Sequence, residues 1–294
     1  MKAFVFPGQA SQFEGMGKDL YENSSTARDM FEEANTILGY RISDIMFTGT
    51  AEQLKETRVT QPAVFLHSVI TARLAGPRFK PDAVAGHSLG EFSALVAAHA
   101  LGFEEGLNLV KVRAEAMQSA CELEPSTMAA IIGLEDDVVI DICDKIDSVV
   151  IAANFNCPGQ IVISGSISGV TQAIEDCKQA GARTAIQLAV GGAFHSPLMS
   201  PAKEALEDEI NRVVMREPIC PIYQNVDGLP HTDVQEIKSN LIAQLTAPVL
   251  WTQTMKNMIQ NGVTEVVEVG GTGKVLRGFF ARIDRRFPTE TLTV

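Results

Sequence analysis

Short apolar runs alternate along the chain with segments whose apolar positions recur at helical spacing. Residues 2–6 form a candidate buried strand that a Pro-Gly pair ends, because proline lacks a strand donor and glycine permits a turn. Residues 82–86 form a second such run, and residues 89–101 and 103–122 have helical patterns. Strands that feed helices on both sides predict a mainly parallel α/β sheet.

The pattern changes between residues 126 and 188 to short strands and amphipathic helices. The strand-like runs lie at residues 128–132, 149–153, 160–164 and 183–188. One helical segment lies between the first and second runs, and another lies between the third and fourth. This β-α-β-β-α-β order is typical of a ferredoxin-like fold. We therefore predict a small inserted domain at residues 125–191. Residues 1–124 and 192–294 would form the large catalytic domain.

A Gly-x-Ser-x-Gly sequence occupies residues 86–90, between the second strand and the helix that follows it. The glycines let the chain turn sharply, so that the Ser88 hydroxyl projects from the turn. The same turn directs the backbone N–H of Leu89 toward any oxyanion formed beside Ser88, and the helix N-terminus adds positive potential. Ser88 is therefore a candidate nucleophile, and a tight turn with a buried serine is the alternative.

A serine hydroxyl needs a neighbouring base to take its proton, and the chain offers five histidines. His67 and His99 lie within expected helices and are interpreted as packing residues. His231 lies in an exposed-looking turn, and His87 should point away from the adjacent serine. His195 is the remaining candidate, because it lies at the junction of the two expected domains, where clefts form. A structural role for this loop histidine is the alternative.

Arg113 falls at the edge of the apolar face of the helix expected from Phe103. A guanidinium keeps its proton in proteins, and its desolvation without a partner is costly. The expected partner of Arg113 is therefore an internal Asp or Glu, or else the carboxylate of a substrate.

Composition narrows the possible functions. A chain of 294 residues, 46% of them apolar, is long enough for one large core or for a large domain with a smaller one. No apolar run approaches the roughly 20 residues of a membrane helix, and no secretory signal is evident, so we expect a cytoplasmic location. The net charge of −12 disfavours binding to nucleic acid. The five cysteines lack metal-ligand spacing, and no metal site is expected.

Further motifs accompany the Gly-x-Ser-x-Gly turn along nearly the whole chain. They are Phe-Pro-Gly-Gln at residues 6–9, Thr-Gln-Pro-Ala at 60–63, Val-Arg at 112–113, Pro-Gly-Gln at 158–160, Gly-Ala-Phe-His-Ser at 192–196 and Pro-Val-Leu-Trp at 248–251. In order and spacing, the sequence resembles the acyltransferase family of fatty-acid and polyketide synthesis, in particular its free-standing malonyl-transferring members. The resemblance implies a hydrolase-like α/β domain with a ferredoxin-like insert.

The resemblance also implies roles for individual residues. Ser88 corresponds to the nucleophile and His195 to its base. The backbone N–H groups of Gln9 and Leu89 correspond to the donors that hold the oxyanion.

Three further positions follow from the same resemblance. Arg113 would bind the malonyl carboxylate. In the family a main-chain carbonyl orients the histidine, and Gln244 holds the matching position. Phe194 resembles the malonyl-selective members. The match departs at residues 270–274, Gly-Gly-Thr-Gly-Lys, where the family has a shorter Gly-Pro-Gly-Lys.

The implied reaction transfers a malonyl group from malonyl-CoA to the phosphopantetheine thiol of acyl carrier protein, for fatty-acid chain elongation. No cofactor is expected, because the coenzyme A thioester is itself a substrate. Carrier proteins of this pathway are acidic, so docking to this acidic chain, expected to be a monomer, needs a basic patch. The densest basic cluster comprises Lys274, Arg277, Arg282, Arg285 and Arg286. An ordinary solvated helix face is the alternative for this cluster.

Two other functions stay open. An α/β-hydrolase-type esterase or thioesterase shares the serine turn, but such enzymes carry their histidine late in the chain and often have an H-G-G-G oxyanion motif, which is absent here. A non-enzymatic acyl-binding protein would have no need for Ser88, His195 and Arg113 together.

Overall fold

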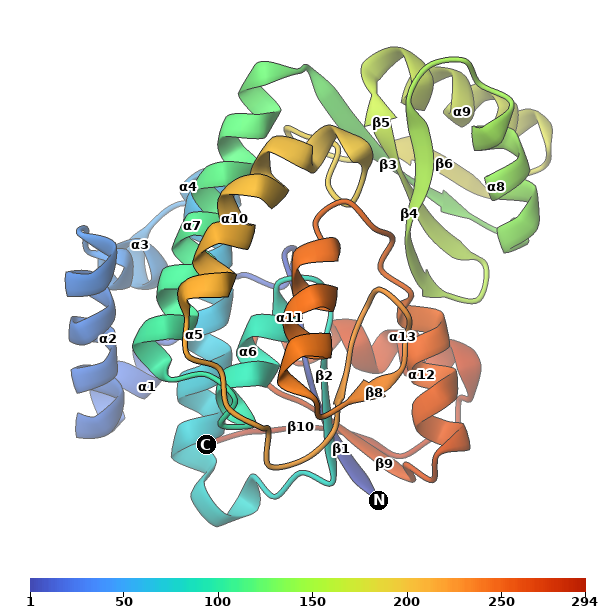
Figure 1. Ribbon diagram of the computed structural model, residues 1–294. Helices are drawn as coiled ribbons and strands as arrows, with labels where there is room; N and C mark the ends of the chain where they lie inside the picture. The colour runs from blue at the N-terminus through green and yellow to red at the C-terminus, as the bar shows by residue number, and fades with distance from the viewer.

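The computed structural model describes all 294 residues and contains two separate β-sheets (Figure 1). The larger sheet has six strands in the order β10-β9-β1-β2-β7-β8. Its strands are β1 (Lys2–Phe6), β2 (Ala83–Gly86), β7 (Ile222–Tyr223), β8 (Pro230–His231), β9 (Glu265–Glu268) and β10 (Thr289–Thr291). Every neighbouring pair is parallel except β7 and β8, so the prediction of a mainly parallel α/β sheet is confirmed.

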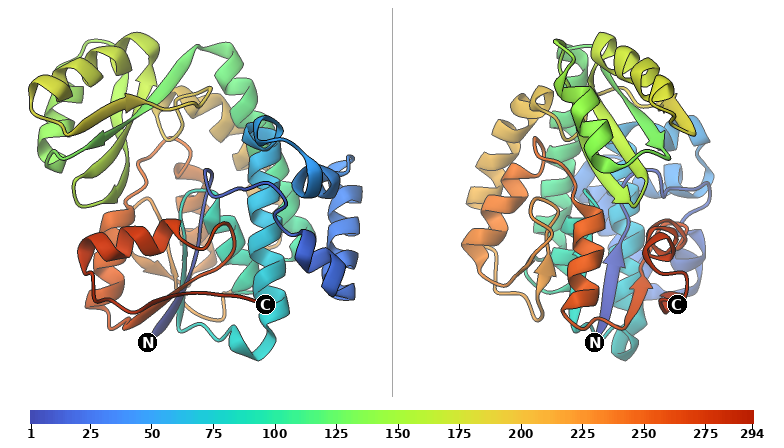
Figure 2. Two further views of the ribbon diagram at one scale, coloured as in Figure 1. Left: turned by 180° about the vertical axis from the view of Figure 1, so that it is seen from behind. Right: turned by 90° about the vertical axis from the view of Figure 1, so that its right-hand side faces the viewer.

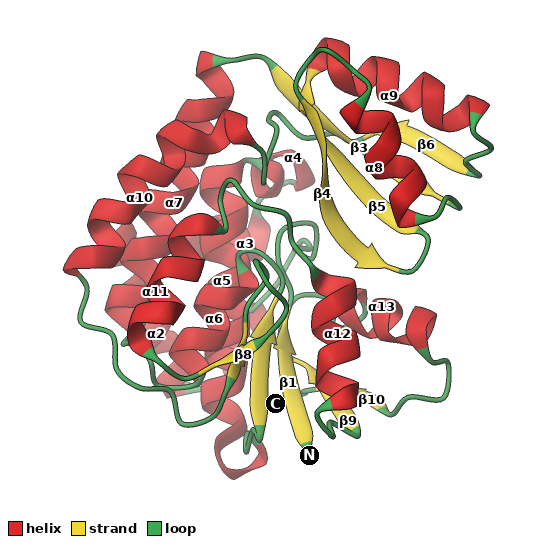
Figure 3. Ribbon diagram, turned by 45° about the vertical axis from the view of Figure 1, so that its right-hand side comes forward, coloured by secondary structure: helices red, strands yellow, loops and turns green.

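Helices cover both faces of this sheet, and β1 shows why (Figure 3). Because strand side chains alternate between faces, Phe4 packs into the core on one side and Val5 into the core on the other. The first core is closed by α5 (Thr57–Ala75), α6 (Gly90–Ala97), α7 (Phe103–Leu123), α10 (Ser200–Arg212) and α11 (Val234–Ala243). The second is closed by α12 (Trp251–Gln260) and α13 (Val275–Ile283). Both faces are therefore buried, as parallel sheets require.

Four further helices form an outer layer against α5 and α7. They are α1 (Lys18–Asn23), α2 (Ser25–Leu38), α3 (Ile42–Thr48) and α4 (Ala51–Lys55). Short 3-10 turns at Gly76–Arg78 and Pro197–Met199 precede β2 and α10. No helix combines the length and the apolar character that a membrane span needs.

The second sheet is antiparallel and has four strands in the order β4-β5-β3-β6. Its elements follow the chain as β3 (Ser126–Ile132), α8 (Asp136–Asp144), β4 (Val150–Cys157), β5 (Gln160–Ser166), α9 (Ile167–Gln179) and β6 (Thr184–Gln187). One face packs on α8 and α9, and the other adds Met128, Ala153 and Val162 to the core of the larger sheet. Figure 2 shows this unit at one end of the molecule, reached through α7.

Backbone hydrogen bonds join the two sheets directly. The Phe155 N–H donates to the Val249 carbonyl at 2.9 Å, and the Val249 N–H donates to the Ala153 carbonyl at 2.8 Å. The Thr252 hydroxyl, at the start of α12, adds a bond to the Phe155 carbonyl at 3.1 Å. The edge strand β4 is thus fixed to the segment that follows α11, close to where residues of both units converge.

Candidate active site

The turn between β2 and α6 holds Ser88 in a strained backbone conformation. Its φ of 52° lies in the left-handed region, which is costly for a residue with a Cβ. The flanking glycines permit this turn, since a Cβ on Gly86 would overlap the Gly90 backbone and one on Gly90 would overlap the Phe6 carbonyl. The strand-turn-helix context that the sequence predicts for Ser88 is confirmed.

His195 is the histidine that reaches the serine. Its Nε2 lies 2.7 Å from the Ser88 Oγ, and its Nδ1 lies 2.9 Å from the main-chain carbonyl of Gln244. Because a carbonyl only accepts, Nδ1 carries the proton and donates it to Gln244, which leaves Nε2 free to accept from the serine hydroxyl. The imidazole is 3% exposed, so bulk water does not compete for this bond.

The loop that carries His195 is anchored to the small sheet. His195 itself has a φ of 58°, a second left-handed residue at the site. The Ser164 hydroxyl of β5 donates to the Phe194 carbonyl at 2.7 Å, and the Ala193 N–H donates to the Ser126 hydroxyl of β3 at 3.0 Å. Two strands of the small sheet therefore fix the backbone on which the imidazole stands.

Arg113 of α7 lies against the same serine and is 1% exposed. Its Nη1 donates to the Gln61 Oε1 at 2.7 Å, and its Nη2 donates to the Ser88 Oγ at 3.0 Å and to the Gln244 Oε1 at 3.2 Å. The guanidinium also lies 5.7 Å from the centre of the Phe92 ring. Every one of these partners is neutral, and no carboxylate forms a salt bridge with Arg113, so its positive charge is available for an anion.

Burial and charge set the protonation states. Burial, together with the positive charge of Arg113, lowers the pKa of His195 to about 3, so the imidazole is neutral at ordinary pH. Burial lowers the pKa of Arg113 to about 10, which leaves the guanidinium charged. Burial raises the pKa of Glu91 to about 8, against the opposing effect of a bond from Asn225. The site thus pairs a neutral base with a fixed cation.

Two backbone N–H groups, one in the serine turn and one in the loop that follows β1, have no partner within the protein. Neither the Gln9 N–H nor the Leu89 N–H donates an intramolecular hydrogen bond. The two loops leave the sheet together, because β1 and β2 pair with Phe6 opposite Gly86 and the His87 N–H donates to the Phe6 carbonyl at 2.9 Å. Backbone N–H groups that converge beside a nucleophile are the donors an oxyanion requires.

The other histidines do not contact Ser88. His87 points away from it, as expected, and its Nε2 bonds the Asn156 Oδ1 at 2.8 Å. His67 packs edge-on against Phe13 with ring centres 5.6 Å apart. His231 lies on β8 and bonds Asp227 at 2.8 Å and Glu236 at 3.1 Å.

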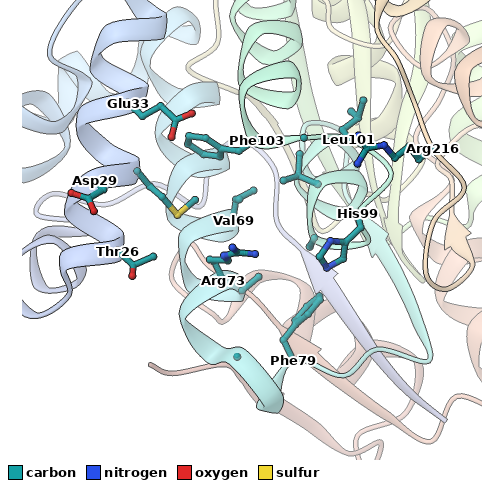
Figure 4. A pocket seen from close by; sticks show the side chains of 16 residues that line it. Thr26, Asp29, Glu33, Val69, Arg73, Phe79, His99, Leu101, Phe103 and Arg216 are labelled. Atoms are coloured by element: carbon teal, nitrogen blue, oxygen red, sulfur yellow. The ribbon is translucent and has the colours of Figure 1, made fainter.

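The interpretation of His99 as a packing residue within a helix is wrong. The helix α6 ends at Ala97, and His99 is exposed with a φ of 62° in the turn before α7. Its side chain lines a cavity of about 600 Å³ between α2, α5 and this turn, together with Arg73 and Arg216 (Figure 4). None of the residues around Ser88 lines that cavity, so the two features are separate.

Several site residues are not predicted from the sequence. Gln61 lies in a quoted motif, and Glu91 directly follows the Gly-x-Ser-x-Gly turn, yet neither has an evident task. Asn225 and Asn156 carry no sequence signal except their places at the ends of strands β7 and β4. A polar Gln, Glu or Asn within a mainly apolar segment is the sequence signal that could have revealed them, and all four side chains are buried in the structure.

The basic cluster lies on α13 and in the residues on either side of it, near the serine turn. Phe279 of α13 lies with its ring centre 6.3 Å from that of His87, which places the helix next to the turn. Arg277 is already engaged, since its guanidinium donates to the Thr291 hydroxyl at 2.7 Å. The four other basic residues are exposed, namely Lys274, Arg282, Arg285 and Arg286. No group of three or more His, Cys, Asp or Glu side chains is placed to hold a metal ion.

Known proteins match this chain over nearly its whole length. The profile of the acyl transferase domain matches residues 3–277. The chain is 42% identical over 291 residues to the malonyl CoA-acyl carrier protein transacylase of Bacillus subtilis, covering 98% of this chain and 92% of the relative. It is also 42% identical over 286 residues to the protein of that name from Haemophilus influenzae, covering 96% and 91%.

Solved structures agree with these relatives. The acyl-carrier-protein-S-malonyltransferase of Bartonella henselae superposes with a TM-score of 0.95 at 39% identity, covering 100% of this chain and 95% of that one. A malonyl-transacylase solved in complex with its type II polyketide synthase acyl-carrier protein gives a TM-score of 0.93 at 36% identity, with the same coverage. A match of this extent in sequence and in fold shows that the chain belongs to the acyl transferase domain family.

Proposed function

We propose that this chain transfers a malonyl group from malonyl-CoA to the phosphopantetheine thiol of acyl carrier protein through an ester on Ser88, supplying fatty-acid chain elongation. The names of its relatives support this reaction. The observation that carries the proposal is the environment of the Ser88 hydroxyl. It bonds a neutral imidazole on one side and a buried guanidinium without a carboxylate partner on the other.

The first half of the reaction forms the ester. The Ser88 Oγ attacks the thioester carbonyl of malonyl-CoA while the His195 Nε2 takes the hydroxyl proton. The carbonyl oxygen becomes an oxyanion, which the N–H groups of Gln9 and Leu89 stabilise. The carbon–sulfur bond then breaks, and coenzyme A leaves as a thiol with the proton that His195 held.

The second half reverses these roles with a new thiol. The phosphopantetheine thiol of the carrier gives its proton to His195, and its sulfur attacks the malonyl ester. The oxyanion forms at the same two backbone donors. Ser88 leaves as an alkoxide and recovers its proton from His195, so protons and charges balance over the cycle.

Arg113 provides the selectivity in this proposal. The malonyl carboxylate would pair with the guanidinium, which in the resting site has only neutral partners. A charge-assisted pair contributes about 1.5–3 kcal/mol, which corresponds to tenfold discrimination or more against an acetyl group. Phe194, 7% exposed beside the base, is the neighbour that the resemblance associates with malonyl selectivity.

Intact-mass spectrometry after incubation with malonyl-CoA tests the proposal. We expect a stable malonyl adduct on the wild-type chain that Ser88→Ala abolishes and that carrier protein removes. Rapid release of free malonate without carrier would instead support the esterase alternative. The absence of any covalent species would support an acyl-binding protein.

We further propose that the carrier docks on the exposed basic residues at the two ends of α13 and in the turn that follows it, namely Lys274, Arg282, Arg285 and Arg286. Their place beside the serine turn suits a partner whose prosthetic group must reach Ser88. Reversal of two of these charges (R285E with R286E) should raise the KM for carrier without changing adduct formation from malonyl-CoA. The matched control is R216E, at the separate cavity. An unchanged KM for carrier would direct the search to another surface.

The finer fold assignment belongs to the same proposal. The β-α-β-β-α-β order and the strand order β4-β5-β3-β6 support a ferredoxin-like domain at residues 125–191. The strand-turn-helix around Ser88 supports a hydrolase-like large domain at residues 1–124 and 192–294. Expression of the small unit alone, followed by a thermal melt, would test its independence.

A further inference from the structure

One buried side chain holds both flanks of the serine turn. The Asn225 Nδ2 donates to the Gly86 carbonyl at 2.7 Å, and the Asn225 Oδ1 accepts from the Ser88 N–H at 2.6 Å. Asn225 follows β7, which pairs with β2 in the sheet, so it reaches the turn from the neighbouring strand. The side chain is fully buried and does not contact the space around the Ser88 hydroxyl through its own polar atoms.

Asn225 is itself fixed on both sides of its backbone. Its N–H donates to the Glu91 Oε1, and its carbonyl accepts from the Leu250 N–H at 2.9 Å. Glu91 is fully buried in the first turn of α6, directly behind the serine turn. Strand β7, helix α6 and the segment before α12 therefore meet at this one asparagine.

The bond to the Ser88 N–H also decides which donors can serve an oxyanion. A backbone N–H that already donates to Asn225 is unavailable to a substrate. The Leu89 and Gln9 N–H groups stay free. A rotation of the backbone at Ser88 would move the Leu89 N–H relative to the Oγ, because the Ser88 Cα carries both the Cβ–Oγ arm and the peptide plane that contains the Leu89 N–H.

We propose that Asn225, held by Glu91, is a positioning residue that keeps Ser88 in its left-handed conformation and thereby aims both the nucleophile and the Leu89 donor. This inference rests on the proposed covalent function of Ser88. A left-handed serine has a local preference to relax toward ordinary φ values, and two hydrogen bonds from one rigid amide oppose that relaxation. Asn225 acts through the turn and does not touch the substrate.

The test compares Asn225→Ala with Gln224→Ala. Gln224 is the equally buried preceding amide, but it bonds the Ile237 carbonyl of α11 at 3.1 Å instead of the serine turn. Quenched time points with malonyl-CoA, read by intact mass, give the acylation rate and the final malonylated fraction separately. A merely structural residue would lower the final fraction, whereas a positioning residue lowers the rate of the folded molecules.

We expect Asn225→Ala to acylate about 10²-fold more slowly, the effect of a displacement of about 1 Å at a reacting group, with a nearly complete final fraction. The KM for malonyl-CoA should change little, since Arg113 is retained. Gln224→Ala should keep the wild-type rate. A wild-type rate in Asn225→Ala, or a loss confined to the final fraction, would overturn the inference.

A second variant covers a failure of Asn225→Ala to fold. Asn225→Asp keeps an acceptor for the Ser88 N–H and loses the donor to the Gly86 carbonyl, so we expect a smaller slowing, of about tenfold. An unslowed Asn225→Asp would contradict the proposal. If the wild-type chain forms no adduct at all, the proposed function itself fails, which the same experiment shows separately.

Discussion

The large and small sheets support the site in different ways. The large sheet carries the Ser88 turn at the end of a strand buried on both faces, with Asn225 and Glu91 behind it. The small sheet contributes no catalytic side chain from a strand, and instead anchors the loop of His195 through Ser164 and Ser126. The proposed nucleophile thus lies at the end of a core strand, whereas the proposed base lies on a loop that connects the two cores. Precise geometry here depends on hydrogen bonds that cross between units.

Removal of the His195 imidazole, the proposed base, should have the largest effect on activity. We expect His195→Ala to lower kcat/KM by about 10³-fold or more, because the loop-borne imidazole is as necessary as the sheet-borne serine. Single-turnover acylation by malonyl-CoA measures the loss. His99→Ala, at the separate cavity, is the control and should retain full activity. A loss below tenfold for His195→Ala would mean that another group takes the proton.

Removal of the fixed cation is the next largest test. Arg113→Ala should reduce the preference for malonyl-CoA over acetyl-CoA by tenfold or more, since a charge-assisted pair of about 1.5–3 kcal/mol is lost. Competition between the two thioesters, read as the ratio of adducts, measures it. Arg113→Lys should restore only part of the preference, because an ammonium lacks the guanidinium fork. An unchanged ratio would show that the carboxylate binds elsewhere.

The effect of burial on Glu91, behind the serine turn, can be tested by measuring stability against pH. The pKa of Glu91 is raised from 4.5 to about 8, so between these values the folded chain keeps a proton that the unfolded chain has lost. Stability from this group is therefore complete below 4.5 and declines as pH rises toward 8. Between these two pH values the wild type should lose up to about 5 kcal/mol of unfolding free energy through this group, and Glu91→Gln should not show this loss.

Denaturant unfolding of both proteins across this pH window provides the measurement. Parallel curves for the wild type and Glu91→Gln would show that Glu91 keeps its ordinary pKa in the folded state. Such a result would also weaken the view that burial alone sets the electrostatics behind the turn.

The anchor between the units gives the smallest expected effect. Ser164→Ala removes one hydrogen bond, worth about 1 kcal/mol, from the backbone beside His195, so we expect kcat to fall about fivefold. Ser168→Ala on the exposed start of α9 is the matched control and should be silent. If neither substitution lowers kcat, the loop of His195 keeps its position without the small sheet, and the two sheets do not differ in how they support the site.

The sequence predicts features that depend on neighbouring residues better than those that depend on distant ones. The serine turn and the order of the small sheet follow from local glycines and apolar periodicity, and both are present in the structure. Strands β8 and β10 are not predicted, because two or three edge residues show no periodicity. The prediction for His99 is wrong, because the apolar residues of the helix expected at 89–101 continue past Ala97, where α6 ends.

The apolar periodicity of the sequence does not predict which distant residues come together in the site. Ser88 and His195 are 107 positions apart, and elimination among the histidines makes His195 only a candidate base, with a structural role as the alternative, until the resemblance assigns it. The neutral partners of Arg113 are equally non-local, since Gln61 and Gln244 come from different ends of the chain. Asn225 is not predicted for the same reason, because it bonds the serine turn at the end of the neighbouring strand β2, 137 to 139 positions away in the sequence.

The carbonyl behind His195 has a chemical consequence for the lifetime of the ester. A carbonyl dipole steadies the imidazolium less than a full negative charge would, and the nearby guanidinium repels it, so this imidazole is a feeble proton acceptor. A thiol, with a pKa near 8.5, needs far less help from such a base than water, at about 15.7, whereas the Ser88 hydroxyl is assisted by its fixed hydrogen bonds to His195 and Arg113. The malonyl ester on Ser88 should therefore react with the carrier thiol much faster than it is hydrolysed by water.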